Sequence, residues 1–200
     1  MRKGFTLIEL LIVIGILAIL ATTVVLVLNP AQILQESRDT QRVSDLGSVQ
    51  SAIGLYLATS PSIDMDVANG TCATNWWSST SATGAANQPF ANPAVQVDSA
   101  TLADSRAVDG NGWVAVNFGL VSGGSPLGSL PIDPSEDATN ALDAGGHFYA
   151  YSCSATNTYE INGNMESAKF GNGGGSDVEN TDGGNEPDIY EIGTEPGLDL

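Results

Sequence analysis

The sequence predicts an α+β fold in which a long N-terminal helix packs by its second half on a small antiparallel β-sheet. Residues 5–28 form an apolar run with one formal charge, and residues 31–58 carry apolar side chains at helical spacing. The chain beyond residue 60 instead holds short runs of aromatic and β-branched residues between turns rich in Gly, Pro, Asn and Asp. These three observations indicate a long helical region followed by a sheet-based head.

The apolar run is long enough to cross a membrane. Its 24 residues would extend roughly 36 Å as a helix, against a hydrocarbon core of ~30 Å. Arg2 and Lys3 precede the run and are expected to hold that end on the cytoplasmic side. We therefore predict a single-pass segment in the cytoplasmic membrane, with the head outside the cytoplasm.

Glu9 is the one formal charge in this apolar run. A charged side chain near the bilayer centre costs a few kcal/mol, and less near an interface, so its presence calls for a function. In an ordinary secretory signal or a plain membrane anchor, the Glu9 carboxylate would have no function. The run is longer than the apolar core of a secretory signal, and no A-x-A cleavage site is evident.

Residues 4–9, Gly-Phe-Thr-Leu-Ile-Glu after a short basic leader, closely resemble the class III signal of type IV pilins and type II secretion pseudopilins. The resemblance implies the pilin fold. It also implies that a membrane aspartyl peptidase, the prepilin peptidase, removes residues 1–4 by cutting between Gly4 and Phe5, and methylates the new amine of Phe5. Glu9 of one subunit would then neutralise the amine of its neighbour, a pairing that is stronger in a medium of low dielectric than in water.

Asn29 and Pro30 interrupt the helical pattern. Proline lacks an N–H and its ring clashes with the carbonyl four residues back, yet Asn followed by Pro is also a good helix start. We therefore expect a helix break at Pro30 with a kink within residues 26–30, and an amphipathic helix over residues 29–60. The apolar stripe of this helix comprises Val43, Leu46, Val49, Ile53, Tyr56 and Leu57.

Residues 35–42 lie in the same helix but are polar on all sides, with weak pairs expected between Asp39 and Arg42 and between Arg42 and Asp45. Two interpretations of these charges stay open. They could meet acidic neighbours across subunits of a filament, or they could simply be solvated.

The head is predicted to span residues 61–200. Residues 64–125 are expected to form a long loop in which Trp76 and Trp77 either cover the helix or sheet or serve as a ligand platform. Alternating patterns elsewhere predict a small antiparallel sheet. Its strands are expected at about residues 113–120, within a hairpin at 147–166, and at 188–192.

Cys72 and Cys153 are the two cysteines of the chain. An even pair in an oxidising compartment predicts a disulfide, which would stabilise the fold by roughly 4–5 kcal/mol on the chain-entropy model. The alternative is two unpaired thiols, one of them buried in the sheet.

Residues 171–188 form an acidic, glycine-rich loop, in which carboxylates and carbonyls could converge on a hard cation. We consider Asp177, Glu179, Asp182 and Asp188 as candidate Ca²⁺ ligands. The resemblance supports this, because major pseudopilins hold calcium in their C-terminal loops. The alternative is a solvated loop without a ligand.

The formal net charge is −17 at pH 7, so direct binding of nucleic acid is not expected. The sequence has no nucleophile–base motif, phosphate loop or Cys/His metal cluster, which argues against an enzyme and leaves Ca²⁺ as the one candidate cofactor.

We therefore predict a structural subunit of a type IV pilus-like filament that resides first in the membrane and then at the cell surface. Its expected partners are other copies of itself, the prepilin peptidase, the filament assembly platform and minor pilins. Two alternatives are a pseudopilin of a type II secretion system and, from a different class, a membrane-anchored adhesin that never polymerises.

Overall fold

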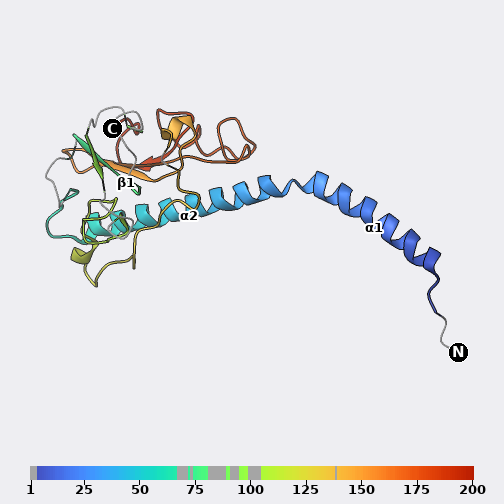
Figure 1. Cartoon of the computed structure of the whole chain (residues 1–200). Helices are drawn as coiled ribbons and strands as arrows, with labels where there is room; N and C mark the ends of the chain where they lie inside the picture. The colour runs from blue at the N-terminus through green and yellow to red at the C-terminus, as the bar shows by residue number, and fades with distance from the viewer. Residues whose placement is uncertain are drawn as a thin grey trace.

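The computed structural model describes residues 4–66, 72, 74–80, 89–90, 95–98, 105–137 and 139–200. Two helices, α1 (Leu7–Leu28) and α2 (Pro30–Thr59), precede a head built on a five-stranded sheet. Figure 1 shows α1 extending away from the head, whereas the C-terminal half of α2 lies against it. The predicted α+β architecture is confirmed.

Helix α1 has no packing partner among the described residues. Its segment Leu7–Val25 is long and apolar enough to cross a membrane, and none of it is buried in the protein. The helix ends at Leu28, and Asn29 adopts a left-handed conformation with φ 37°. Pro30 then occupies the first turn of α2. The bend between the two helices in Figure 1 thus falls at the position that the Asn-Pro pair predicts.

The sheet has the strand order β2-β1-β3-β4-β5. Strands β3 (Ala150–Cys153) and β4 (Tyr159–Gly163) form the predicted antiparallel hairpin, and β5 (Tyr190–Gly193) pairs with β4. Strand β1 (Asn75–Ser78) is antiparallel to β3, but its pairing with β2 (Val95–Asp98) is parallel. The sheet is therefore mostly antiparallel.

The prediction of one long loop over residues 64–125 is wrong. Strands β1 and β2 both lie within it and extend the sheet. Trp76 and Trp77 are adjacent residues of β1, so they point to opposite faces of the sheet, and both are buried. They cover the sheet on its two sides, which agrees with their structural interpretation.

The predicted strand at 113–120 is also wrong. Residues Trp113 to Val116 are all fully buried, whereas a half-exposed strand would alternate. The backbone N–H of Trp113 donates to the carbonyl of Ser105 at 3.0 Å, so this segment pairs with a neighbouring loop instead of the sheet. The short 3₁₀ helix η2 (Phe118–Leu120) then ends it, because Asn117 Oδ1 accepts from the N–H of Gly119. Packing from both sides thus overrides the period-two pattern.

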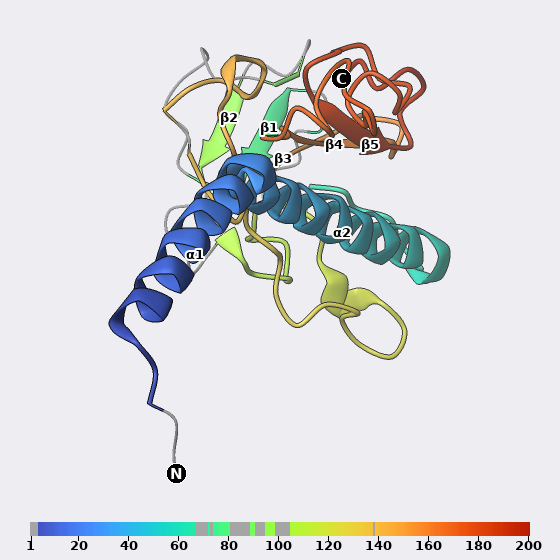
Figure 2. The same cartoon turned by 90° about the vertical axis from the view of Figure 1, so that its right-hand side faces the viewer.

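The main core lies between α2 and the inner face of the sheet (Figure 2). Helix α2 contributes the predicted stripe, of which Val43 and Leu57 are only partly buried. The outer face of the sheet carries a second apolar cluster that includes Trp76, Phe148 and Ile189. The fully buried members of the main core from α2 and the sheet include Leu46, Val49, Ile53, Tyr56, Tyr151 and Ile161.

Candidate functional site

The N-terminus of α1 is closed by a capping box. Thr6 Oγ1 accepts from the backbone N–H of Glu9 at 3.3 Å, and Glu9 Oε2 accepts from the backbone N–H of Thr6 at 2.9 Å. The Thr6 hydroxyl also donates to Glu9 Oε2 at 2.7 Å. Glu9 therefore satisfies donors that the first turn of a helix leaves free.

Gly4 and Phe5 precede this cap outside any helix or strand, and Phe5 is 81% exposed. The bond between them lies outside the helix, where a peptidase can reach the backbone. After cleavage at this bond, the new amine of Phe5 would lie next to Thr6, which the Glu9 carboxylate contacts. The structure thus places the predicted processing and assembly residues at one end of an exposed apolar rod.

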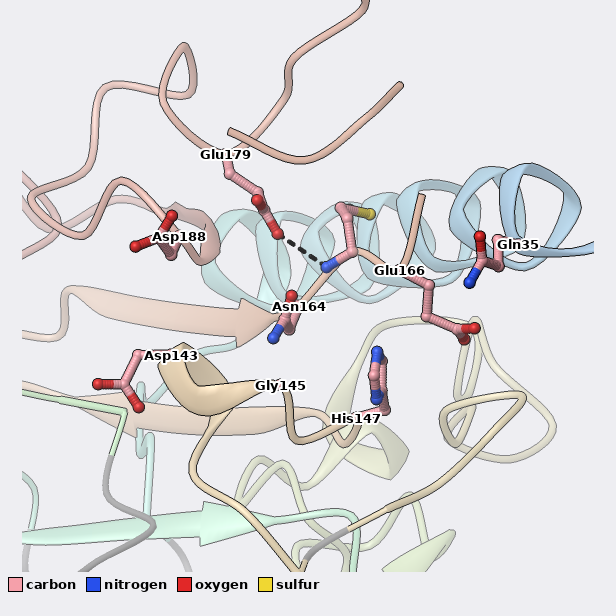
Figure 3. A pocket seen from close by; sticks show the side chains of 9 residues that line it. Gln35, Asp143, Gly145, His147, Asn164, Glu166, Glu179 and Asp188 are labelled. Carbon is pink, nitrogen blue, oxygen red and sulfur yellow. Dashed lines mark hydrogen bonds between the residues drawn. The ribbon is translucent and has the colours of Figure 1, made fainter. Parts of the chain in front are cut away.

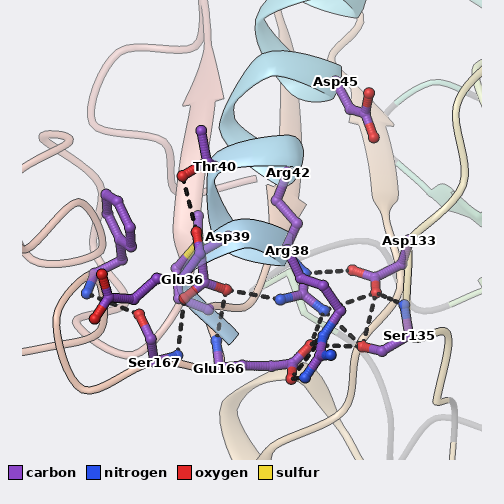
Figure 4. Close-up of polar contacts among 12 residues, drawn as sticks. Glu36, Arg38, Asp39, Thr40, Arg42, Asp45, Asp133, Ser135, Glu166 and Ser167 are labelled. Carbon is purple, nitrogen blue, oxygen red and sulfur yellow. Dashed lines mark hydrogen bonds and ion pairs between the residues drawn. The ribbon is translucent and has the colours of Figure 1, made fainter. Parts of the chain in front are cut away.

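A buried ionic cluster fastens α2 to the head, and we define it as Arg38, Asp39, Arg42, Asp133 and Glu166 (Figure 4). The Arg42 side chain is fully buried and donates from Nε and Nη2 to the two carboxylate oxygens of Asp133, at 2.7 and 2.8 Å. It also donates to Asp39 Oδ1 at 2.7 Å and to Glu166 Oε1 at 2.5 Å.

Backbone groups complete this ionic cluster. Asp39 accepts from the N–H groups of Glu166 and Ser167 at 2.9 and 2.8 Å, so a helix side chain holds the chain that follows β4. Arg38 also makes an ion pair with Glu166. The charges of Arg38, Asp39 and Arg42 are thus not simply solvated, since they meet partners in the same chain.

The Asp39–Arg42 pair was predicted, whereas Asp133 and Glu166 were missed because they lie more than 90 residues from Arg42. The expected pair between Arg42 and Asp45 does not form, and Asp45 accepts from the Tyr149 hydroxyl instead.

The electrostatics of the cluster follow from these contacts. Burial opposes ionisation of Glu166, but hydrogen bonds from Arg38, Ser135 and Arg42 lower its pKa to about 2. Burial likewise opposes the charged form of Arg42, yet the hydrogen bonds to Asp133 and Glu166 raise its pKa. Glu166 and Arg42 are therefore ionised at neutral pH, and each faces opposite charge within the cluster.

Cys72 and Cys153 form a disulfide with a Cα–Cα distance of 4.9 Å, in agreement with the prediction. It ties the segment before β1 to β3 across 81 residues of sequence. Asp66 lies next to it and accepts from the backbone N–H of Cys72. Although Asp66 and the two sulfurs lie close enough to hold a metal, the disulfide uses both sulfurs.

The four predicted calcium ligands are engaged with their own chain. Asp177 accepts from three backbone N–H groups, and Glu179 accepts from those of Met165 and Asn172. Asp182 accepts from two backbone N–H groups, and Asp188 accepts from the side-chain amide of Asn172. In the part of the chain that the structure describes, no three of these carboxylates approach within 4.8 Å of one another. The calcium site in this loop stays a prediction.

Two of these carboxylates, Glu179 and Asp188, line an open polar cavity of about 550 Å³ (Figure 3). Glu166 and Asp143 line it as well, so its charge favours a cation over an anion. Burial lowers the pKa of His147, whose Nε2 has no hydrogen-bond partner among the described residues, and this keeps the imidazole neutral at pH 7. Burial also raises the pKa of Glu179 to about 7, against the backbone hydrogen bonds that it accepts.

Comparison with known families identifies the N-terminal segment. Residues 1–25 match the family model described as the prokaryotic N-terminal methylation motif. No curated protein and no solved structure matches the chain. The match covers Gly4, Phe5 and Glu9 and the greater part of α1.

Proposed function

We propose that this chain, which carries the processing signal of type IV pilin-like and pseudopilin precursors, is a structural subunit of a type IV pilus-like filament. The main support for the proposal is that the methylation motif, the exposed apolar helix and the head follow one another directly in the chain. The methylation motif runs directly into an apolar helix that packs against none of the residues the structure describes, and that helix joins a disulfide-bonded head through α2. An exposed apolar rod needs either lipid or other copies of itself to cover it.

The proposed maturation starts at the exposed bond between Gly4 and Phe5. The prepilin peptidase would cut there on the cytoplasmic face and methylate the Phe5 amine, with Arg2 and Lys3 holding that end inside. The head would lie outside the cytoplasm, where the disulfide between Cys72 and Cys153 can persist. The assembly platform would then extract the subunit from the bilayer and add it to the filament.

Glu9 would direct this addition. In the unprocessed chain its carboxylate caps its own helix. In a filament it would also neutralise the Phe5 amine of a neighbouring subunit, a pairing that specifies one stagger between subunits because an uncompensated charge in an apolar medium is costly.

A pseudopilin of a type II secretion system is the second candidate. The acidic, glycine-rich chain between β4 and β5 favours it, by resemblance to the calcium-holding loops of major pseudopilins. The same processing and stacking would then build a short filament that pushes secreted proteins outward. A membrane-anchored adhesin that never polymerises is the rival from another class, and it requires α1 to remain in the bilayer.

The proposal is tested by electron microscopy of sheared surface fractions together with N-terminal sequencing of the mature protein. We expect fibres that contain this chain, beginning at a methylated Phe5. A mature protein that begins with Phe5 but stays in the membrane fraction would indicate the anchored adhesin. A protein that keeps Met1 would overturn every function based on processing.

A further inference from the structure

The outer face of the sheet buries two carboxylates next to each other. Glu160 on β4 and Glu191 on β5 are each 1% exposed, and the register of these paired strands brings both side chains to one face, on diagonally adjacent positions. The register places Asn162 directly opposite Glu191, with its side chain on the same face as both glutamates. Asn162 is fully buried and donates from Nδ2 to Glu160 Oε1 at 2.8 Å.

No positive charge compensates this pair. None of the ion pairs among the described residues includes Glu160 or Glu191. The charges that act on the two carboxylates are themselves acidic, Asp199 on Glu160 and Asp182 on Glu191. Two adjacent ionised carboxylates removed from water are strongly unfavourable without a bound cation or proton.

Two oxygen atoms of the group lack any partner. Glu191 Oε1 and Asn162 Oδ1 are buried and accept no hydrogen bond in the described structure. A single proton on Glu191 Oε1, donated to Asn162 Oδ1 or to Glu160, would neutralise one of the two carboxylates and leave the other ionised. A divalent cation can accept both free oxygens as ligands and, unlike one proton, can neutralise both buried carboxylates.

The surrounding chain is built closely around these carboxylates. Leu200 N–H donates to Glu160 Oε2 at 3.0 Å, and Glu186 N–H donates to Glu191 Oε2 at 2.9 Å. The backbone at Gly184 passes so near that a Cβ there would lie 2.0 Å from Glu191 Oε2. A groove of about 290 Å³, lined in part by Asp182 and Glu195, reaches Glu191 and offers a route of entry.

We propose that Glu160, Glu191 and Asn162 bind one divalent cation of the Ca²⁺ class between strands β4 and β5. All three donors are oxygen atoms, which suit Ca²⁺, whereas Zn²⁺ favours nitrogen and sulfur. Ca²⁺ also tolerates irregular geometry better than Mg²⁺, and its remaining ligands would be backbone carbonyls or water. This site differs from the predicted loop site, because its ligands come from paired strands and not from residues 177, 179, 182 and 188.

The test measures thermal unfolding of the full chain in detergent, first freed of metal with a chelator and then titrated with Ca²⁺ or Mg²⁺. At a free Ca²⁺ concentration about 100 times the Kd, Tm should rise by roughly 5–10 °C, and Mg²⁺ should do much less. Glu160→Gln and Glu191→Gln should each abolish the rise. Both variants should fold without metal, because a Gln amide can donate to the remaining carboxylate.

Glu186→Gln is the matched control, since Glu186 is exposed on the same segment and contacts Glu191 through its backbone alone. It should keep the full Ca²⁺ response. Terbium luminescence gives a second readout, because Trp76 lies on the same face of the sheet and can sensitise a bound Tb³⁺. That signal should disappear in Glu191→Gln and persist in Glu186→Gln.

Three outcomes would overturn the proposal. One is a wild-type chain whose Tm responds to pH but not to Ca²⁺, which would assign a shared proton to the pair. Another is a Ca²⁺ response that survives both Gln variants. The third is a response that Asp177→Asn removes and Glu191→Gln leaves intact, which would move the ion into the acidic loop. None of these outcomes bears on filament assembly, which the sheared-fraction experiment tests separately.

Discussion

Arg42 and Asp133 form a two-point ion pair in which Nε and Nη2 of the guanidinium donate to the two carboxylate oxygens at 2.7 and 2.8 Å, with both side chains fully buried. The pair joins helix α2 to a loop 91 residues further along the chain. Because α2 continues from the apolar helix α1, this contact helps to hold the helical rod to the head. We consider it the main polar fastening between the two parts.

Replacing Arg42 should therefore destabilise the head severely. Arg42→Met leaves the carboxylates of Asp39 and Asp133 buried without their partner, and we expect a loss of about 3–5 kcal/mol in the free energy of unfolding. Urea unfolding of the full chain in detergent measures it. Arg106→Met is the matched control, because Arg106 is exposed and, in the described part of the chain, donates to Leu130 O and Ser129 Oγ without an ion pair. Equal losses in the two variants would show that the buried pair adds nothing specific.

The same cluster predicts how stability depends on acid. The pKa of Glu166 falls from 4.5 to about 2 on folding, so its contribution is complete above pH 4.5 and is lost as the pH falls toward 2. Glu166→Gln should be less stable than the wild type at pH 7, and its stability should change less between pH 4.5 and 2. The two unfolding curves should converge at low pH. Parallel curves over that range would contradict the assigned role of Glu166.

The disulfide should account for a large part of the stability of the head. Cys72→Ala with Cys153→Ala removes a cross-link over 81 residues, which corresponds to about 4–5 kcal/mol on the chain-entropy model. A reductant should lower the Tm of the wild type toward that of the double variant and should leave the double variant unchanged. If reductant shifted neither protein, the cross-link would not contribute to stability.

The parts of the fold that could be predicted from the sequence are those with a local cause. The apolar run made α1 predictable, and Asn29 with Pro30 located the bend because both act on their own backbone. The β3–β4 hairpin was predictable from two alternating runs close in sequence. In contrast, β1 is four residues long and becomes a strand only because β3 and β2 pair with it.

The long-range pairs of the ionic cluster and the buried glutamates were missed for a related reason. Nothing next to Arg42 in the sequence indicates Asp133 or Glu166, and the pairing exists only once the head is folded. Glu160 and Asn162 alternate with apolar residues, a pattern typical of a solvated sheet face, but segments around Ile189 and Leu200 cover that face. That Glu160 and Glu191 are buried can be recognised only once the fold shows which segments lie over this face of the sheet.

The capping box makes it possible to separate two roles of Glu9. A Gln at this position can still accept from the N–H of Thr6 and so keep the cap, but it carries no charge. A Glu9→Ala variant would lose both the cap and the charge. Filament assembly by Glu9→Gln therefore reports on the charge alone.

The most direct measurement of the central claim is the amount of this chain in sheared surface filaments from cells that make the wild type or Glu9→Gln, with membrane insertion and cleavage after Gly4 followed in the same cells. We predict that Glu9→Gln is inserted and cleaved normally but yields no filaments. Filaments of wild-type abundance from Glu9→Gln would contradict the account, because the carboxylate would then cap its own helix without pairing subunits.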